Sequence, residues 1–238
     1  MTYLDFIFIG IIVFSSVAGA IKGLITTVFG FLSTVIALIF AYVFYHFLSG
    51  LLIESTKLFS FFQEKIADAL DLNALSQSVV SNIDRKEMIQ GIEVPGFLKT
   101  LLIENDNSEI YNALGINANN QAGDYVSSFL ATIAINVMAF IILFIIGLII
   151  IGILTNILDL IAKLPVLKQV NHVGGLILGF ITGVIMLWVL SLGLYLIVSM
   201  QGGGDLQALI DKSTVVLIFY DNNLLLNFLT NVTQSIFR

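Results

Sequence analysis

Residues 133–154 read IAINVMAFIILFIIGLIIIGIL, a run of 22 positions without an ionisable side chain. At about 1.5 Å per helical residue, such a run can cross the ~30 Å hydrocarbon core of a bilayer. The composition of the whole chain agrees, because 58% of its 238 residues are hydrophobic and only 11% are charged. Soluble domains carry about 25% charged residues. We therefore predict an integral membrane protein.

Four helices of spanning length are expected. They run from Tyr3 to about Ile21, from Leu24 to about Leu48, from an Asp124 cap to about Leu160, and from Val173 to about Met200. Lys22-Gly23 joins the first two, and a polar turn containing Pro165 joins the last two. The predicted fold is all-α and polytopic, with four transmembrane helices in two hairpins, residues 1–49 and 124–200.

The first apolar run has an alternative interpretation as a cleaved signal peptide. Ala18-Gly19-Ala20 is similar to a small-residue cleavage site. No positive charge precedes the run, however, and a second apolar run follows at once. These two features favour a retained helix.

Residues 50–123 differ sharply from the hairpins, because acidic, Asn and Ser side chains and the Pro95-Gly96 turn signal are frequent there. This predicts a mostly helical aqueous insert. One amphipathic helix is expected in it, with an apolar face made by Leu58, Phe61, Phe62, Ile66 and Leu70. Shorter helical pieces are expected at 74–83, 97–103 and 108–114.

Residues 201–238 begin with the Gly202-Gly203-Gly204 break and place polar residues too often for a further crossing. A fifth span is the alternative that this spacing disfavours. We predict an interfacial amphipathic tail, because its apolar residues follow helical spacing: Leu225, Phe228, Leu229, Val232 and Ile236.

Orientation follows from a few lysines. Lys22 lies in one short connection, and Lys163 and Lys168 lie in the other, whereas the insert is acidic. The positive-inside rule then places both short connections in the cytoplasm. The insert and both termini are predicted to be extracytoplasmic.

Several short motifs together resemble the colicin V production (CvpA) family of bacterial inner-membrane proteins. The stretch 164–167, LPVL, is followed by Asn171 and by Gly175, Gly179 and Gly183, which is similar to the turn and helix of that family. Asp5, Gly19 and Lys22-Gly23 match the pattern of its first hairpin. Lys212-Ser213 and 220–223, YDNN, are similar to the C-terminal end of members from Gram-positive bacteria.

The chain also departs from the family's pattern. Thr26 and Thr27 stand where charged residues often follow the basic-Gly pair, and His172 stands where Arg is frequent. The resemblance implies a protein of the cytoplasmic membrane associated with production of a secreted toxin and with envelope physiology. It implies no defined molecular activity.

Small residues at four-residue spacing form the clearest constellation in the sequence. One set is Ser15, Gly19 and Gly23, and the other is Gly175, Gly179 and Gly183. Such spacing lets two helix backbones approach closely, so we predict that the two sets pack on each other. A seam beside a substrate path remains the alternative.

Asp5 and Asn136 are the polar residues expected inside or at the edge of the bilayer, where such groups can mark ion or proton routes. An interfacial or capping role for Asp5, and an interhelical hydrogen bond for Asn136, are the simpler interpretations. His46 and His172 are predicted at opposite faces of the membrane, which argues against a two-histidine metal site.

The sequence favours no catalytic, cofactor or metal site. It lacks cysteine, a Gly-rich phosphate loop and a His-Glu-x-x-His motif. A net charge of -6 with ten dispersed Lys and Arg residues argues against nucleic acid as a partner. The expected partners are the lipid bilayer and other membrane or secretion proteins, and a homo-oligomer stays open.

Two main functions remain. The first is a non-enzymatic scaffold or accessory factor for toxin production or export and for envelope maintenance. The second is a small transporter or channel component of the cytoplasmic membrane. An intramembrane enzyme is the third and least supported alternative.

Overall fold

The computed structural model describes residues 1–72, 82–116, 122–158, 168–201, 204–226 and 228–229. In these ranges the regular elements are helices. The chain divides into two compact units. Unit 1 contains Met1–His46, Ala139–Leu192 and Leu209–Asn223, and unit 2 contains Phe47–Met138, Gly193–Ala208 and Leu224–Arg238.

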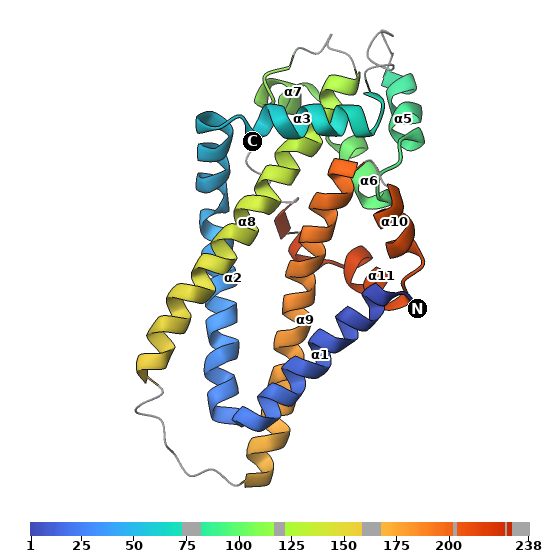
Figure 1. Ribbon diagram of the computed structural model, residues 1–238. Coiled ribbons are helices and arrows are strands. Elements are labelled where there is room, and N and C mark those ends of the chain that lie inside the picture. The colour runs from blue at the N-terminus through green and yellow to red at the C-terminus, as the bar shows by residue number, and fades with distance from the viewer. Residues whose placement is uncertain (73–81, 117–121, 159–167, 202–203, 227, 230–238) are drawn as a thin grey trace. The chain divides into compact units, whose positions relative to one another are not determined.

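Four long helices are apolar enough to cross a membrane by length and composition (Figure 1). They are α1 (Tyr3–Lys22), α2 (Leu24–Ser55), α8 (Ala122–Leu158) and α9 (Lys168–Gln201). The prediction of an all-helical protein with four such helices is confirmed. The Pro165 turn expected between the last two lies outside the described residues.

The ends of three long helices differ from the predicted ones. Helix α9 begins at Lys168, inside the predicted polar turn, rather than near Val173, because the residues that follow Pro165 are not helix breakers. Helix α2 continues to Ser55 rather than ending near Leu48, because 51–53, LLI, are good helix formers and Gly50 alone does not break a helix. Helix α8 begins at Ala122, so Asp124 lies in its first turn instead of capping it. A carboxylate in the first turn still interacts favourably with the helix dipole.

The described residues of unit 2 form the short helices α3 (Leu58–Ala69), α5 (Asn82–Gly91), α6 (Gly96–Glu104) and α7 (Ser108–Ala113). Phe62 and Ile66 of the predicted apolar face of α3 are buried, but Phe61 is 45% exposed. Helices α6 and α7 lie where short helical pieces were predicted. Helix α5 was not predicted, because its polar sequence lacks an apolar period, and most of the expected piece 74–83 lies outside the described residues.

The tail contains α10 (Gly204–Asp211) and α11 (Thr214–Asp221). Helix α11 belongs to unit 1 and packs on α1, where the rings of Phe8 and Phe219 lie 6.0 Å apart. An interfacial position of the tail stays a prediction. Val232 and Ile236 of its expected apolar face lie outside the described residues.

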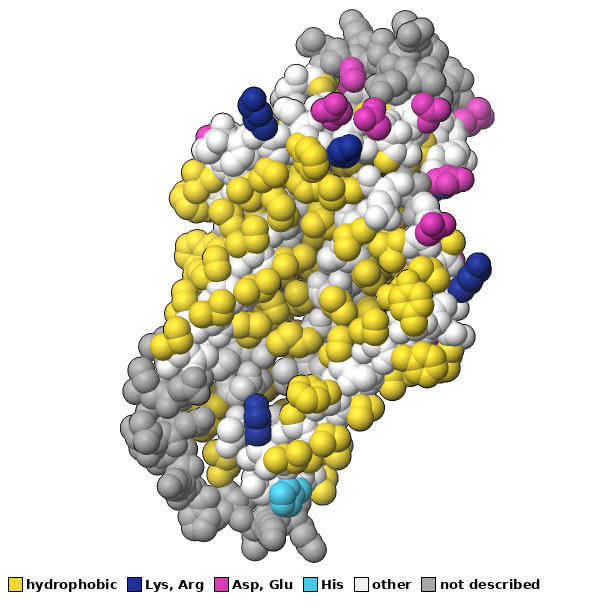
Figure 2. Space-filling view, in the orientation of Figure 1, with side chains coloured by type: hydrophobic (Ala, Val, Ile, Leu, Met, Phe, Trp, Pro, Cys, Tyr) yellow, Lys and Arg dark blue, Asp and Glu magenta, His cyan; other side chains and the backbone are white. Residues whose placement is uncertain are grey.

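Hydrophobic side chains cover much of the surface of the long helices (Figure 2). Large hydrophobic side chains of the long helices are exposed, and Phe14 of α1 is 77% exposed. A soluble monomer rarely carries such a continuous apolar surface, whereas a lipid-facing one requires it. Within unit 2, the exposed residues of the short helices include the acidic residues Glu64, Asp68 and Glu87.

Candidate functional site

The turn between α1 and α2 is a single residue, Gly23, whose φ of +83° lies in the left-handed region. A glycine is required there for a second reason, because a Cβ would collide with the side-chain amide of Asn171 at the start of α9. The Asn171 Oδ1 atom accepts the Leu24 backbone N–H at 2.7 Å. Asn171 thus satisfies one of the N–H groups that the first turn of α2 leaves without a helical partner.

The neighbouring residue, His172, adds a second hydrogen bond where the end of α1, the start of α2 and the start of α9 meet. We call this junction the corner. The His172 Nδ1 atom lies 2.7 Å from the carbonyl oxygen of Ala20, in the last turn of α1. Because a carbonyl can only accept, Nδ1 carries the hydrogen in this contact. The corner therefore joins the end of α1, the start of α2 and the start of α9 through hydrogen bonds.

From this corner α1 and α9 stay in close backbone contact along the two predicted sets of small residues. A Cβ built on Gly19 would lie 3.0 Å from the Cα of Gly179, and one built on Gly175 would lie 3.0 Å from the carbonyl carbon of Gly23. Further along, a Cβ on Gly183 would lie 3.2 Å from the Cβ of Ser15. We call Ser15, Gly19, Gly23, Gly175, Gly179 and Gly183 the glycine seam.

Ser15 adds a hydrogen bond to this contact. Its Oγ donates to the carbonyl oxygen of Gly179 at 2.7 Å, across the two helices. Backbones that approach this closely gain van der Waals contacts that larger side chains would prevent. The seam is a close helix–helix contact between α1 and α9.

Asp5 is fully buried and connects α1 to α11. Its carboxylate accepts the backbone N–H of Thr2 at 2.9 Å and those of Val215 and Val216 at 2.8 and 3.3 Å. The hydroxyl groups of Thr2 and Ser213 bond each other beside it. Asp5 therefore caps two helix N-termini at once, where a negative charge is stabilised.

In unit 2, Asn136 of α8 is buried and pairs with Ser49 of α2. The Ser49 Oγ donates to the Asn136 Oδ1 at 2.5 Å.

A second polar cluster connects the short helices of unit 2. The Arg85 guanidinium lies 3.1 Å from the Asp106 carboxylate. The Tyr111 hydroxyl donates a hydrogen bond to that same carboxylate. Burial, and then this hydrogen bond, raise the pKa of Tyr111.

Several contacts of this site were not predicted from the sequence, among them those of Asn171, Ser213, Ser49 and Thr27. The sequence pointed to Asn171 and Ser213 only through the family resemblance. It did not mark Ser49 or Thr27 as site residues. Thr27 donates to the carbonyl oxygen of Gly23 at 2.7 Å and so supports the same corner. The signal that could have found Asn171 is its type, since Asn is a preferred cap, but its partner is 147 positions away.

No group of three or more metal-ligating side chains occurs among the described residues. His46 and His172 both belong to unit 1, and His172 is used in the corner contact. The arrangement at this site serves to join helices.

Long apolar helices whose backbones meet at a glycine seam, with buried polar pairs between them, are typical of polytopic α-helical membrane proteins. The family model described as Colicin V production protein matches residues 4–80 and 112–224, and the chain belongs to that family. The match includes every residue of the seam as well as Asp5, Asn136, Asn171 and Ser213. Neither a curated protein nor a solved structure matches the chain.

Proposed function

We propose that this protein is a non-enzymatic scaffold or accessory factor of the bacterial cytoplasmic membrane that supports production or export of a colicin V-type toxin and maintenance of the envelope. The family supports a role in toxin production. The observation that carries the scaffold role is that polar groups on the long helices bind other parts of the protein. Ser15 bonds α9, Asp5 bonds α11, and Asn136 bonds Ser49.

A scaffold needs a surface that binds its partners. The insert, residues 50–123, is the part whose composition differs most from that of the long apolar helices. Its exposed acidic side chains and the buried Arg85–Asp106 pair support a folded aqueous region. Residues 81–111 also lie outside the family match, so this region is where the chain has features of its own. We place the partner-binding surface there.

In the proposed topology the corner faces the cytoplasm, and the insert and both termini face outward. Lys22 and Lys168 support this orientation under the positive-inside rule. Because the chain has no cysteine, single replacements can be labelled without background. An impermeant maleimide applied to whole cells should label Asn107→Cys and spare His172→Cys, both at exposed positions. The opposite labelling pattern would invert the topology.

A small transporter is the second candidate, and one observation favours it. The Tyr45 hydroxyl, the His46 Nε2 and the Ser191 Oγ are buried in unit 1 without a hydrogen-bond partner in the described part of the chain. Unsatisfied polar atoms in a membrane are costly, and they mark ion or substrate paths in transport proteins.

One pair of measurements separates the two functions. Cells that carry a colicin V system but lack this protein should regain toxin secretion equally with the wild type, Tyr45→Phe and Ser191→Ala. Liposomes that contain only this protein and an internal pH-sensitive dye should conduct protons no faster than empty ones. The opposite result has two parts: both variants fail to restore secretion, and the wild-type protein conducts protons in liposomes whereas both variants do not. That result would refute the scaffold and identify a transporter.

A further inference from the structure

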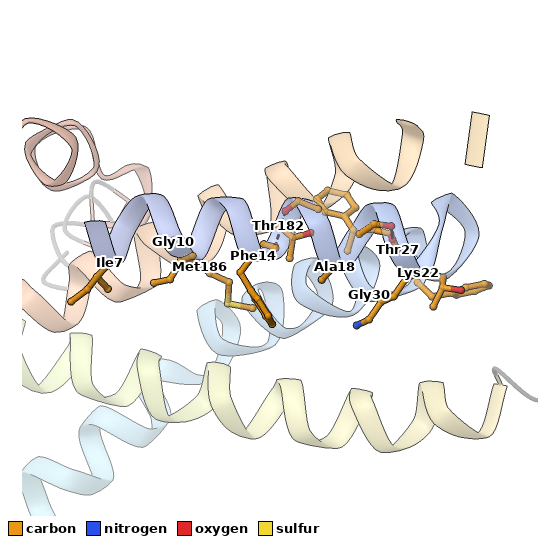
Figure 3. A pocket seen from close by; sticks show the side chains of 16 residues that line it. Ile7, Gly10, Phe14, Ala18, Lys22, Thr27, Gly30, Thr182 and Met186 are labelled. Atoms are coloured by element: carbon orange, nitrogen blue, oxygen red, sulfur yellow. Dashed lines mark hydrogen bonds between the residues drawn. The ribbon is translucent and has the colours of Figure 1, made fainter. Parts of the chain in front are cut away.

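A groove in unit 1 runs beside the glycine seam (Figure 3). It has a volume of about 640 Å³ and is lined by residues of α1, α2 and α9. Along α1 its wall extends from Ile7 through Phe14 and Ala18 to Lys22. Pockets of ~300–1,000 Å³ are the usual size for small-molecule sites.

The groove has room for a long apolar group. Hydrophobic side chains and glycines make up most of its lining. Two of the glycines leave it open, because a Cβ added to Gly10 or Gly30 would meet no atom within 4 Å. This contrasts with the seam glycines, where a Cβ collides. Because Phe14 beside the groove is largely exposed, the groove opens onto the surface that faces lipid.

One end of the groove is cationic. Lys22 is the last residue of α1, whose 20 residues cover ~30 Å, so it lies at the end of a length that spans the hydrocarbon core. A lysine side chain at such a position is long and flexible enough to extend to the lipid phosphates. No acidic side chain of the described ranges forms an ion pair with Lys22. The exposed Thr26, in the first turn of α2, lines the same end and adds a hydroxyl donor.

We propose that this groove holds one anionic phospholipid, with an acyl chain along α1 and its phosphate on Lys22 and Thr26. The dimensions agree, because half of the hydrocarbon core is ~15 Å, or about ten helical residues. Counted back from Lys22, that length ends near Ile12, inside a groove that continues to Ile7. Lys22, which forms no ion pair within the described ranges, selects at the phosphate end a headgroup with net negative charge over a zwitterionic one.

A tryptophan reporter tests the proposal in liposomes. In a Trp188→Phe background, which removes the sole native tryptophan, Phe14→Trp places a reporter on the groove. Brominated phosphatidylglycerol and brominated phosphatidylcholine are then compared as quenchers. A single lysine near anionic lipid contributes about 1 kcal/mol, which corresponds to an approximately five-fold preference for phosphatidylglycerol. Lys22→Gln should remove this preference, and Lys22→Arg should keep it.

The control reporter is Ile177→Trp in the same background, because Ile177 is exposed on α9 but does not line the groove. It should show no preference between the two lipids. Equal quenching by both lipids at position 14, or a preference that survives Lys22→Gln, would overturn the proposal. A preference of the same size at position 177 would show general enrichment of anionic lipid and would overturn it too.

A second measurement needs no tryptophan substitution. Native mass spectrometry of the detergent-extracted protein should detect one retained phosphatidylglycerol on the wild type. Gly30→Leu fills the groove without a backbone collision and should abolish retention, whereas Gly50→Leu, at an equally open position of α2 outside the groove, should not. Equal retention by both variants would refute the assignment to this groove.

Discussion

Replacing Gly179 by alanine tests the glycine seam with the smallest available change. The added Cβ would lie 3.1 Å from the Cα of Ser16 and would also collide with the carbonyl group of Ser15. Backbone atoms cannot move aside as a flexible side chain can, so α1 and α9 must separate. The hydrogen bond from the Ser15 Oγ to the Gly179 carbonyl, 2.7 Å long, would stretch as they do.

The magnitude follows from a comparison with Gly193→Ala. Gly193 lies on the same helix, but a Cβ there meets nothing within 4 Å. Both substitutions gain helix propensity, about 1 kcal/mol in water, so this gain cancels between them. The difference that remains is the overpacking of Gly179, about 1–3 kcal/mol. Since 1 kcal/mol shifts the Tm of a chain of this size by about 2–4 °C, the two variants should differ by roughly 2–12 °C.

Thermal unfolding of the purified variants in one detergent measures this difference. Equal Tm values for Gly179→Ala and Gly193→Ala would refute the close backbone contact. A disulfide provides a check that does not depend on stability: the Cβ atoms at 15 and 183 would lie 3.2 Å apart, close to the ~3.5–4.5 Å of natural disulfides. Ser15→Cys with Gly183→Cys should therefore crosslink within one chain. Crosslinking of 183 to 183 between two chains would instead make the seam a dimer contact.

Three further predictions concern the other polar contacts. Asn171→Ala should lower stability by about 1 kcal/mol through loss of a helix cap, whereas Asn171→Asp, which keeps the acceptor for the Leu24 N–H, should cost less; equal unfolding temperatures would refute the cap. Asp5→Ala should raise hydrogen exchange in 214–221 and leave 24–46 unchanged, and unaltered exchange in 214–221 would contradict its role as an anchor. The pKa of Tyr111 is raised by burial, so the folded state keeps a proton that the unfolded chain loses above about pH 10. Stability should therefore be fully present below that pH and fall above it, and Tyr111→Phe should reduce the fall in unfolding temperature measured from about pH 9 to 11; an unchanged fall would contradict this explanation.

The long helices could be predicted from sequence because the bilayer imposes one requirement on each of them, a long apolar run. Their ends were less predictable. Hydropathy falls at Ser49 and Gly50, yet α2 continues to Ser55, because helix formation depends on backbone propensity rather than on apolarity. Helix α5 has no apolar period to reveal it, and its Arg85 is buried against Asp106 and Tyr111, which lie more than 20 positions along the chain.

Some residues of the candidate site could be predicted from the sequence, whereas the partners of others could not. Spacing alone pointed to the two sets of small residues, because every fourth residue lies on one helix face. The partners of Asp5 and Asn171 could not be derived, since each bonds a segment more than 140 positions away. Nothing local marks Asn171 as the cap of α2 or Ser213 as the neighbour of Asp5. Such contacts depend on the tertiary arrangement of the helices.

Most of the residues that carried the family resemblance make structural contacts. Gly23 has a positive φ and no room for a Cβ, Asn171 caps the next helix, and Asp5 holds α11. A carboxylate engaged by backbone N–H groups and an amide engaged as a cap are poor candidates for binding a passing solute, since a ligand would have to displace those bonds at the cost of leaving buried groups unpaired. Lys22 differs from them, because it belongs to the same motif yet makes no ion pair within the described ranges and lies at the end of an open groove. Lys22 is therefore the residue through which this motif, besides holding the helices together, would bind a lipid phosphate.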